Sequence, residues 1–220
     1  MSHSPFKRSL LALGLSAAVL GLAGSLTACV PLMVGGAAGT VLVASDRRTS
    51  GAQIEDEGIE LRAASRINSS LGTRVRINVV SFNRQVLLTG EVPNAQDKQA
   101  VEQLVTKVEN VKSVVNELAV MSTPSLADRS ADLLITGRLK AAILDASDLQ
   151  SSAFKVVTEH NAVYLMGLVT QREADRVTNL ARAVPGVRRV VRVFEVITED
   201  DLRRLQPMPS KPSSVQAKKV

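Results

Sequence analysis

Apolar positions along the middle of the chain recur with two different periods. Between residues 54 and 198, stretches with partly alternating apolar residues, typical of strands, separate stretches with apolar residues at i, i+3, i+4 and i+7, typical of helices. Two such helical stripes are Val101, Leu104, Val105, Val108 and Val177, Leu180, Ala181, Val184. Each stripe predicts an amphipathic helix that buries one side against other elements.

The same order of elements occurs twice in the chain. Residues 76–115 resemble residues 154–191, with Gly90 corresponding to Gly167 and the two helical stripes corresponding to each other. Two copies at this long spacing indicate a duplicated domain, because solenoids use more numerous and shorter repeats. We expect domains at residues 54–122 and 128–198.

Each copy reads as helix, strand, strand, helix, strand. The leading helices are expected at residues 54–71 and 130–145, and polar hairpin tips "NR" and "HN" join the first two strands. Asn94 is the expected N-cap of one following helix, and Thr170 with Glu173 forms a capping box for the other. The predicted fold class is α+β, with two tandem α-β-β-α-β domains that each pack two helices on one face of a three-stranded sheet.

The first 28 residues have the pattern of a secretory signal. Lys7 and Arg8 precede the apolar run "LLALGLSAAVLGLAGSLTA", and no acidic residue occurs before Cys29. The run ends in Leu-Thr-Ala-Cys, which resembles the lipobox of bacterial lipoproteins. That resemblance implies cleavage after residue 28 and acylation of Cys29, the only cysteine in the chain. A transmembrane anchor and a catalytic thiol are the alternatives, although no base or orienting group lies near Cys29 in the sequence.

The segments outside the two repeats have their own composition. Residues 29–53 are expected to form a lipidated N-terminus and tether, with an apolar part too short for a transmembrane helix and a polar join "SDRRTSGAQ". The Pro-, Ser- and Lys-rich residues 199–220 are expected to be a disordered tail. Val30 is not Asp, and among lipoproteins this absence favours the outer membrane over retention in the inner membrane.

The order of elements, the glycine within each hairpin and the length of each copy resemble the BON domain family. Two stretches, "ASDRRTSGAQIEDEGIELRAASRI" (44–67) and "FKVVTEHNAVYLMGLVTQREA" (154–174), are especially similar to its members with two domains behind a lipobox. The resemblance implies an outer-membrane lipoprotein that faces the periplasm, binds anionic phospholipid and supports envelope integrity. It implies no catalytic residues. In this family the second leading helix can begin with an aromatic residue, where this chain has Leu133 and Leu134.

Composition argues against several other classes of function. The formal charge of +6 falls to +4 without Lys7 and Arg8, and aromatic residues make up only 2% of the chain, so a single-strand nucleic-acid binder is disfavoured. His160 is the only histidine after the signal and is expected to be a solvated turn residue, without enough neighbours for a metal site. The acidic run Glu55–Asp56–Glu57 is expected to serve a helix start. We expect no enzyme activity, cofactor or small-molecule substrate.

The leading helix of the second copy carries the candidate lipid-binding residues. Leu133 and Leu134 lie off the buried stripe of Ile135, Leu139 and Ile143, and Arg138 and Lys140 lie nearby. Exposed leucines beside cations fit an interfacial contact with anionic phospholipid. The linker 122–129 could instead cover these leucines.

The rival hypothesis is a non-enzymatic periplasmic adaptor or holdase for outer-membrane assembly proteins, with a BON sheet or helix face as its docking surface. The arginines at 188, 189 and 192 on the last strand have a simpler reading, as charges that block pairing at a sheet edge.

Overall fold

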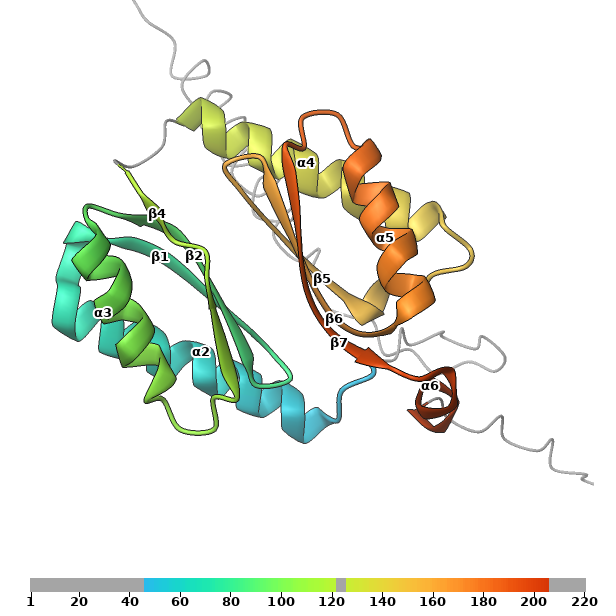
Figure 1. Ribbon diagram of the computed structural model, residues 1–220, viewed down its shortest axis with the longest axis horizontal. Helices are drawn as coiled ribbons and strands as arrows, with labels where there is room; N and C mark the ends of the chain where they lie inside the picture. Colours follow the sequence, from blue (N-terminus) through green and yellow to red (C-terminus); the bar gives the residue numbers. More distant parts are fainter. Residues whose placement is uncertain (1–45, 122–125, 206–220) are drawn as a thin grey trace, which may run out of the picture. The chain divides into compact units, whose positions relative to one another are not determined.

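The computed structural model describes residues 46–121 and 126–205, and it contains two domains with the same order of elements (Figure 1). The elements of domain 1 are α2 (Ser50–Leu71), β1 (Arg76–Phe82), β2 (Gln85–Val92), α3 (Ala95–Thr106), β3 (Ser113–Asn116) and β4 (Ala119–Val120). Domain 2 contains α4 (Leu126–Asp145), β5 (Phe154–Glu159), β6 (Ala162–Thr170), α5 (Gln171–Ala183) and β7 (Arg189–Ile197), and α6 (Glu199–Leu205) follows it. The short 3₁₀ turns η2 (Gly72–Arg74) and η3 (Ser151–Ala153) precede β1 and β5.

Both sheets have the same topology. In each, a hairpin of antiparallel strands is followed by a helix that returns the chain to a parallel strand beside the second hairpin strand, giving the orders β1-β2-β3 and β5-β6-β7. The two helices of each domain pack on one face of its sheet (Figure 1). This confirms the predicted tandem α-β-β-α-β fold.

The caps and turns form as their residues predict. The Asn94 side chain accepts a hydrogen bond from the Asp97 N–H at the start of α3, and Thr170 and Glu173 form the complete capping box of α5. Both two-residue hairpin tips, Asn83–Arg84 and His160–Asn161, have positive φ angles, as a tight hairpin turn requires.

Several element boundaries differ from the expectation. The last strand of domain 1 is interrupted between β3 and β4, because Leu118 turns into the core and is only 2% exposed. α2 begins at Ser50, before the predicted start of domain 1 at residue 54, and Thr49 is its N-cap. Part of the expected tether is therefore helical. Residues 199–205, expected in a disordered tail, form α6 and bury Leu202.

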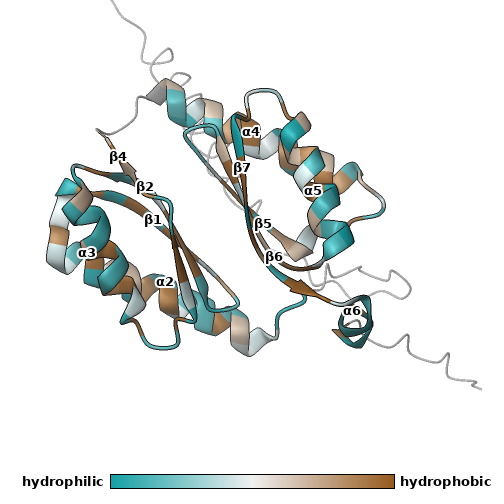
Figure 2. Ribbon diagram, viewed as in Figure 1, coloured by the Kyte–Doolittle hydropathy of each residue, from teal (hydrophilic) through white to brown (hydrophobic). Residues whose placement is uncertain are grey.

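Each domain has its own core between its helices and its sheet. Domain 1 buries Ile59, Ala63, Ile67, Val86, Leu88, Val92, Val101 and Val105, and domain 2 buries Ile135, Leu139, Ile143, Val163, Leu165, Val177 and Ala181. The helices are correspondingly mixed in hydropathy, with polar residues on the sides away from the sheets (Figure 2). Leu104 and Leu180 of the predicted stripes lie at the margins of these cores and are only partly buried.

A third core joins the two domains, which belong to one compact unit. Its side chains come from the sheet faces that carry no helices: Val80, Phe82 and Leu87 of domain 1, and Val157, Ala162, Tyr164, Met166, Leu168 and Val193 of domain 2. Each sheet is therefore covered on both faces, which explains why all nine residues of β6 are buried instead of alternating.

A buried aspartate in each leading helix binds the neighbouring hairpin tip. The carboxylate of Asp56 accepts hydrogen bonds from the N–H groups of Asn83 and Arg84, at 2.7 and 2.8 Å. Asp132 does the same for His160 and Asn161, at 2.9 and 2.8 Å. Asp56 therefore does not lie at the start of the helix, as its place in an acidic run suggested. Its hydrogen bonds instead connect α2 to the β1-β2 hairpin.

Candidate functional site

The outer side of α4 carries three large apolar residues in contact with solvent. Leu133, Leu134 and Leu144 are 73%, 59% and 69% exposed, whereas Ile135 and Leu139, on the opposite side of the helix, are buried. Both leucines are therefore exposed among the residues that the structure describes, and residues 122–125 of the linker lie outside that part of the chain. The sequence left open whether the linker covers Leu133 and Leu134, and among the described residues both leucines are exposed.

Arg138 and Lys140 lie at the two margins of this apolar side. Successive residues of a helix point about 100° apart around its axis. Measured from Lys140, Leu133 lies at about 20°, Leu144 at about 40°, Leu134 at about 120° and Arg138 at about 160°. Gly137 and Ala141 lie between the leucines, and the two cations lie at the margins. The exposed carboxylate of Asp145 lies about 20° around the helix from Arg138, near the C-terminal end of α4, so only the Lys140 margin is free of acidic residues. Arg138 and Lys140 are exposed, and neither forms an ion pair among the residues that the structure describes. We call this surface the α4 face.

The equivalent surface of domain 1 has the opposite charge. Ile54 and Leu61 on α2 are 70% and 73% exposed, so α2 also presents apolar side chains. Glu57 is exposed beside them, and Glu60 lies at their margin, where its carboxylate accepts a hydrogen bond from the Ser81 N–H. Corresponding helices of the two domains thus present exposed apolar side chains beside acidic residues in α2 and beside Arg138 and Lys140 in α4.

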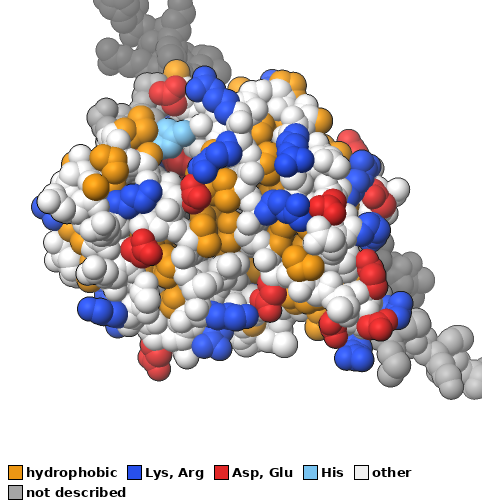
Figure 3. Space-filling view, in the orientation of Figure 1, with side chains coloured by type: hydrophobic (Ala, Val, Ile, Leu, Met, Phe, Trp, Pro, Cys, Tyr) orange, Lys and Arg blue, Asp and Glu red, His pale blue; other side chains and the backbone are white. Residues whose placement is uncertain are grey.

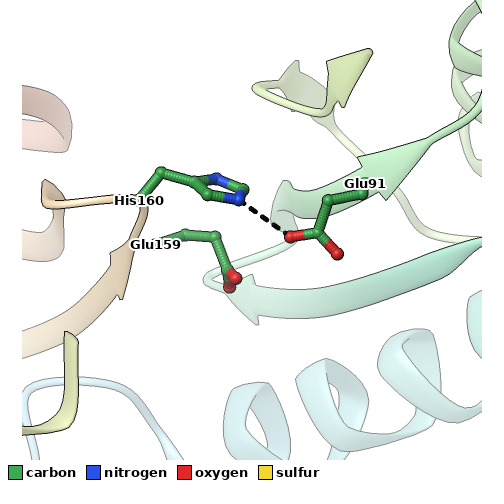
Figure 4. Close-up of side chains that lie close together, drawn as sticks. All are labelled: Glu91, Glu159 and His160. Atoms are coloured by element: carbon green, nitrogen blue, oxygen red, sulfur yellow. Dashed lines mark ion pairs between the residues drawn. The ribbon is translucent and has the colours of Figure 1, made fainter. Parts of the chain in front are cut away.

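A cluster of polar side chains lies where the two domains meet (Figure 4). His160 Nε2 is 3.0 Å from Glu91 Oε1, and Glu159 lies beside both, so three potential metal-ligand atoms lie within 4.8 Å of one another. The carboxylates of Glu91 and Glu159 already bind the guanidinium of Arg76. It donates hydrogen bonds to Glu91 at 2.6 and 2.8 Å and also donates to Glu159. The hydrogen bond to Glu91 is the main reason that the pKa of Arg76 is raised above its ordinary value.

This cluster is best described as an ionic contact between domains, since a metal ion would have to displace a fully charged guanidinium. His160 does lie at a hairpin tip, as predicted, but it is not a freely solvated turn residue. The sequence did not reveal this contact, because Glu91 and His160 belong to different domains.

The arginines of β7 serve the protein's own contacts. Arg189 pairs with Glu117 of domain 1 and donates to the Tyr164 hydroxyl, while Arg192 pairs with Asp175 on α5. β7 is an edge strand of its sheet, as the edge-blocking interpretation requires. Figure 3 shows a face on which Lys and Arg lie among apolar strips and acidic side chains, a mixed surface rather than a continuous basic patch.

Attachment to a membrane through a lipid and attachment through a helix concern different parts of the chain. Cys29 and the signal region lie outside the described residues. Within residues 46–121 and 126–205, no helix has both the length and the apolar character to cross a bilayer.

Comparisons with known proteins agree with this architecture. The family profile described as "BON domain" matches the chain twice, over residues 55–122 and 131–198. The chain is 35% identical over 199 residues to "Outer membrane lipoprotein DolP" of Haemophilus influenzae, an alignment that covers 90% of this chain and 100% of that protein. It is 32% identical over 154 residues to "21 kDa hemolysin" of Actinobacillus pleuropneumoniae, covering 69% and 79% of the two chains. "Osmotically-inducible protein Y" of Escherichia coli is 31% identical over 117 residues, 52% of this chain and 58% of that one.

Proposed function

The chain belongs to the family of BON domain proteins, and on this premise we propose that it is an outer-membrane lipoprotein whose second domain binds anionic phospholipid. The name of its full-length relative, an outer membrane lipoprotein, supports the location and the lipid anchor. The proposed role is non-enzymatic support of envelope integrity from the periplasmic side of the membrane. The relatives carry no enzyme name, which agrees with this role.

The observation that carries the lipid proposal is the α4 face. Burying exposed leucines in the acyl boundary is favourable by about 25 cal/mol per Å² of apolar surface, and the flanking cations Arg138 and Lys140 meet anionic headgroups. Each cation near such a surface contributes about 1 kcal/mol. The acidic flank of α2 supports the assignment of this contact to domain 2 rather than to domain 1.

The anchor and the α4 face have separate roles in this proposal. Acyl chains at Cys29 would hold the protein on the membrane, since each buried CH₂ contributes about 0.8 kcal/mol. The α4 face then selects anionic lipid within that membrane. In cells grown with a labelled fatty acid, the Cys29→Ala protein should carry no label, and label retained by this variant would exclude Cys29 as the acylation site.

Vesicle binding tests the lipid contact without the anchor. A form that begins at residue 45 contains every described element and domain contact, so it is suitable for solution measurements. We expect this form to bind anionic vesicles and not to bind neutral vesicles. Arg138→Glu with Lys140→Glu should weaken binding more than about tenfold, because two charges are reversed and 1.4 kcal/mol corresponds to tenfold. Rising salt should shrink the difference between variant and parent.

The matched control reverses two exposed cations elsewhere. Lys107→Glu with Arg182→Glu changes the net charge by the same amount, on domain 1 and on α5, and should reduce binding much less. Equal binding to neutral and anionic vesicles, or a folded Arg138 and Lys140 double variant that binds like the parent, would reject the lipid contact. Capture of an outer-membrane assembly protein by such a lipid-blind form would favour the adaptor or holdase function instead.

A further inference from the structure

A small groove runs along the inner margin of the α4 face, between α4 and β5. Its lining includes Lys140, Ile143, Leu144, Ser151, Phe154 and Val156, and its volume is about 220 Å³. The lining is predominantly apolar apart from the ammonium of Lys140 and the serine hydroxyls. β5 pairs with β6 alone, so the groove lies at an open edge of the sheet.

The floor and the wall of the groove differ in exposure. Ile143 and Val156 form part of the domain 2 core and are 2% and 9% exposed, so the floor is held in place by packing. Leu144 forms a wall that stands 69% exposed on the same side of α4 as Leu133. A ligand in the groove would therefore bury Leu144 and would lie directly beside the α4 face.

The charge at the rim indicates one end of the ligand. Lys140 has no ion-pair partner among the described residues, and it lies only about 40° around the helix from Leu144. Asp145, the nearest acidic residue on α4, points about 140° away from Lys140. A ligand with an apolar segment and a negative end fits this arrangement.

The size restricts the apolar segment. Pockets for small molecules and cofactors usually measure about 300–1,000 Å³, and this groove is smaller. It has room for a slender chain but not for a polar headgroup, which the apolar floor would leave without hydrogen-bond partners.

We infer that the groove between α4 and β5 binds part of an acyl chain of an anionic phospholipid, with its phosphate at Lys140. This inference rests on the proposed lipid contact of domain 2 and deepens it. The α4 face would then do more than lie on a lipid surface, because it would hold an individual lipid molecule by chain and headgroup together.

Monomeric lipid tests the groove separately from membrane binding. The probe is phosphatidylglycerol with hexanoyl chains, kept below its micelle concentration, and its chain-free counterpart is glycerophosphoglycerol. We expect saturable changes in the NMR signals of Ile143, Leu144 and Val156 with the first and none with the second. Contacts from the chain methyls to the Ile143 and Val156 methyls should appear as intermolecular nuclear Overhauser effects in the parent protein.

A variant in which a large side chain fills the groove tests whether the groove is the binding site. Ser151 is half-buried in η3, and Ser151→Trp should fill the groove and weaken binding of the short-chain lipid at least tenfold. Ser69→Trp, on the exposed side of α2, is the matched control and should bind like the parent. Circular dichroism checks the fold of both variants, and the nuclear Overhauser contacts in the parent decide the question if Ser151→Trp does not fold.

The outcomes separate this inference from the proposed function. Absence of monomer binding, equal binding of chain-free glycerophosphoglycerol, or undiminished binding by folded Ser151→Trp would overturn the groove as a chain site. If the parent still binds anionic vesicles in that case, the lipid function of α4 stands without the groove. Absence of vesicle binding would reject that function, while saturable, chain-dependent binding of the monomer would still support the groove as a lipid site.

Discussion

Arg47 and Glu173 form a buried ion pair with two hydrogen bonds, at 2.8 and 2.7 Å, although 125 residues separate them in the sequence. Their side chains are only 5% and 3% exposed. Arg47 also donates to the Leu168 carbonyl at 2.9 Å. A residue that precedes domain 1 in the chain is therefore bound to domain 2.

The next residue binds the other domain. Arg48 pairs with Asp56 of α2 at 2.7 Å, and its guanidinium lies 4.1 Å from the centre of the Phe82 ring. The two neighbouring arginines thus connect the start of the described chain to both domains. Asp46 is 17 residues after Cys29, which allows a reach of at most about 60 Å between the acylation site and this point.

Loss of Arg47 should destabilise the folded protein strongly. Arg47→Ala leaves the buried Glu173 carboxylate without its cation, and such a change lowers the free energy of unfolding by about 3–5 kcal/mol. Replacing both partners, with Arg47→Met and Glu173→Gln, should cost less than Arg47→Ala alone. Urea denaturation measures these differences. Arg203→Ala, which breaks the exposed pair with Asp200, is the control and should cost about 0–1 kcal/mol.

The same pair should make stability depend on acid pH. Burial acts to raise the pKa of Glu173, but the hydrogen bonds from Arg47 and from the Thr170 N–H outweigh it and hold the pKa below its ordinary value. The folded pKa is therefore lower than the unfolded value of about 4.3. The stabilisation is present above that unfolded value and is lost as the pH falls through the folded pKa.

Glu173→Gln removes this titration. Its urea midpoint should be lower than that of the parent at neutral pH and should fall less steeply as the pH is lowered from about 5 to 3. Parallel curves for the two proteins across this range would show that Glu173 has the same pKa in the folded and unfolded states.

Leu87 and Leu88 provide a matched test of the core between the domains. Both are 0% exposed, but Leu88 packs in the core of domain 1 and Leu87 packs against domain 2. Each change to Ala should cost about 2–5 kcal/mol. Leu88→Ala should weaken domain 1 directly, whereas Leu87→Ala should weaken the contact between domains and separate their unfolding transitions. Hydrogen exchange followed domain by domain measures this, and identical exchange patterns in the two variants would contradict it.

Gly90 and Gly137 should respond oppositely to a methyl group. Gly90 has a φ of 113°, and a Cβ there would lie 2.1 Å from the Arg76 carbonyl oxygen, so Gly90→Ala should lower the melting temperature. Gly137 lies within α4 with nothing within 4 Å of a Cβ, so Gly137→Ala should stabilise the helix by up to about 1 kcal/mol. Thermal unfolding distinguishes the two, and a harmless Gly90→Ala would mean that the β1-β2 hairpin can shift.

The elements and the duplication could be predicted from the sequence because they depend on local patterns. The i, i+3, i+4, i+7 stripes, the caps at Asn94 and Thr170 and the hairpin tips are each read within a few residues. The caps and tips form as predicted, and the stripes are buried except at Leu104 and Leu180, which are only partly buried. The place of Leu133 and Leu134 off the buried stripe followed in the same way, from their angles around a single helix, but the sequence left open whether the linker covers them.

Contacts between distant parts of the chain were decided only by the tertiary structure. The sequence predicted β2 and β6 as the second strands of their hairpins, but nothing local indicates that Leu87 faces another domain while Leu88 faces a helix. Asp56 reads as one charge in an acidic run until the hairpin N–H groups are brought to it. Arg47 reads as part of a polar join until Glu173 is placed beside it. Periodicity specifies which side of an element is buried, whereas the identity of the group that it meets depends on how separate elements pack.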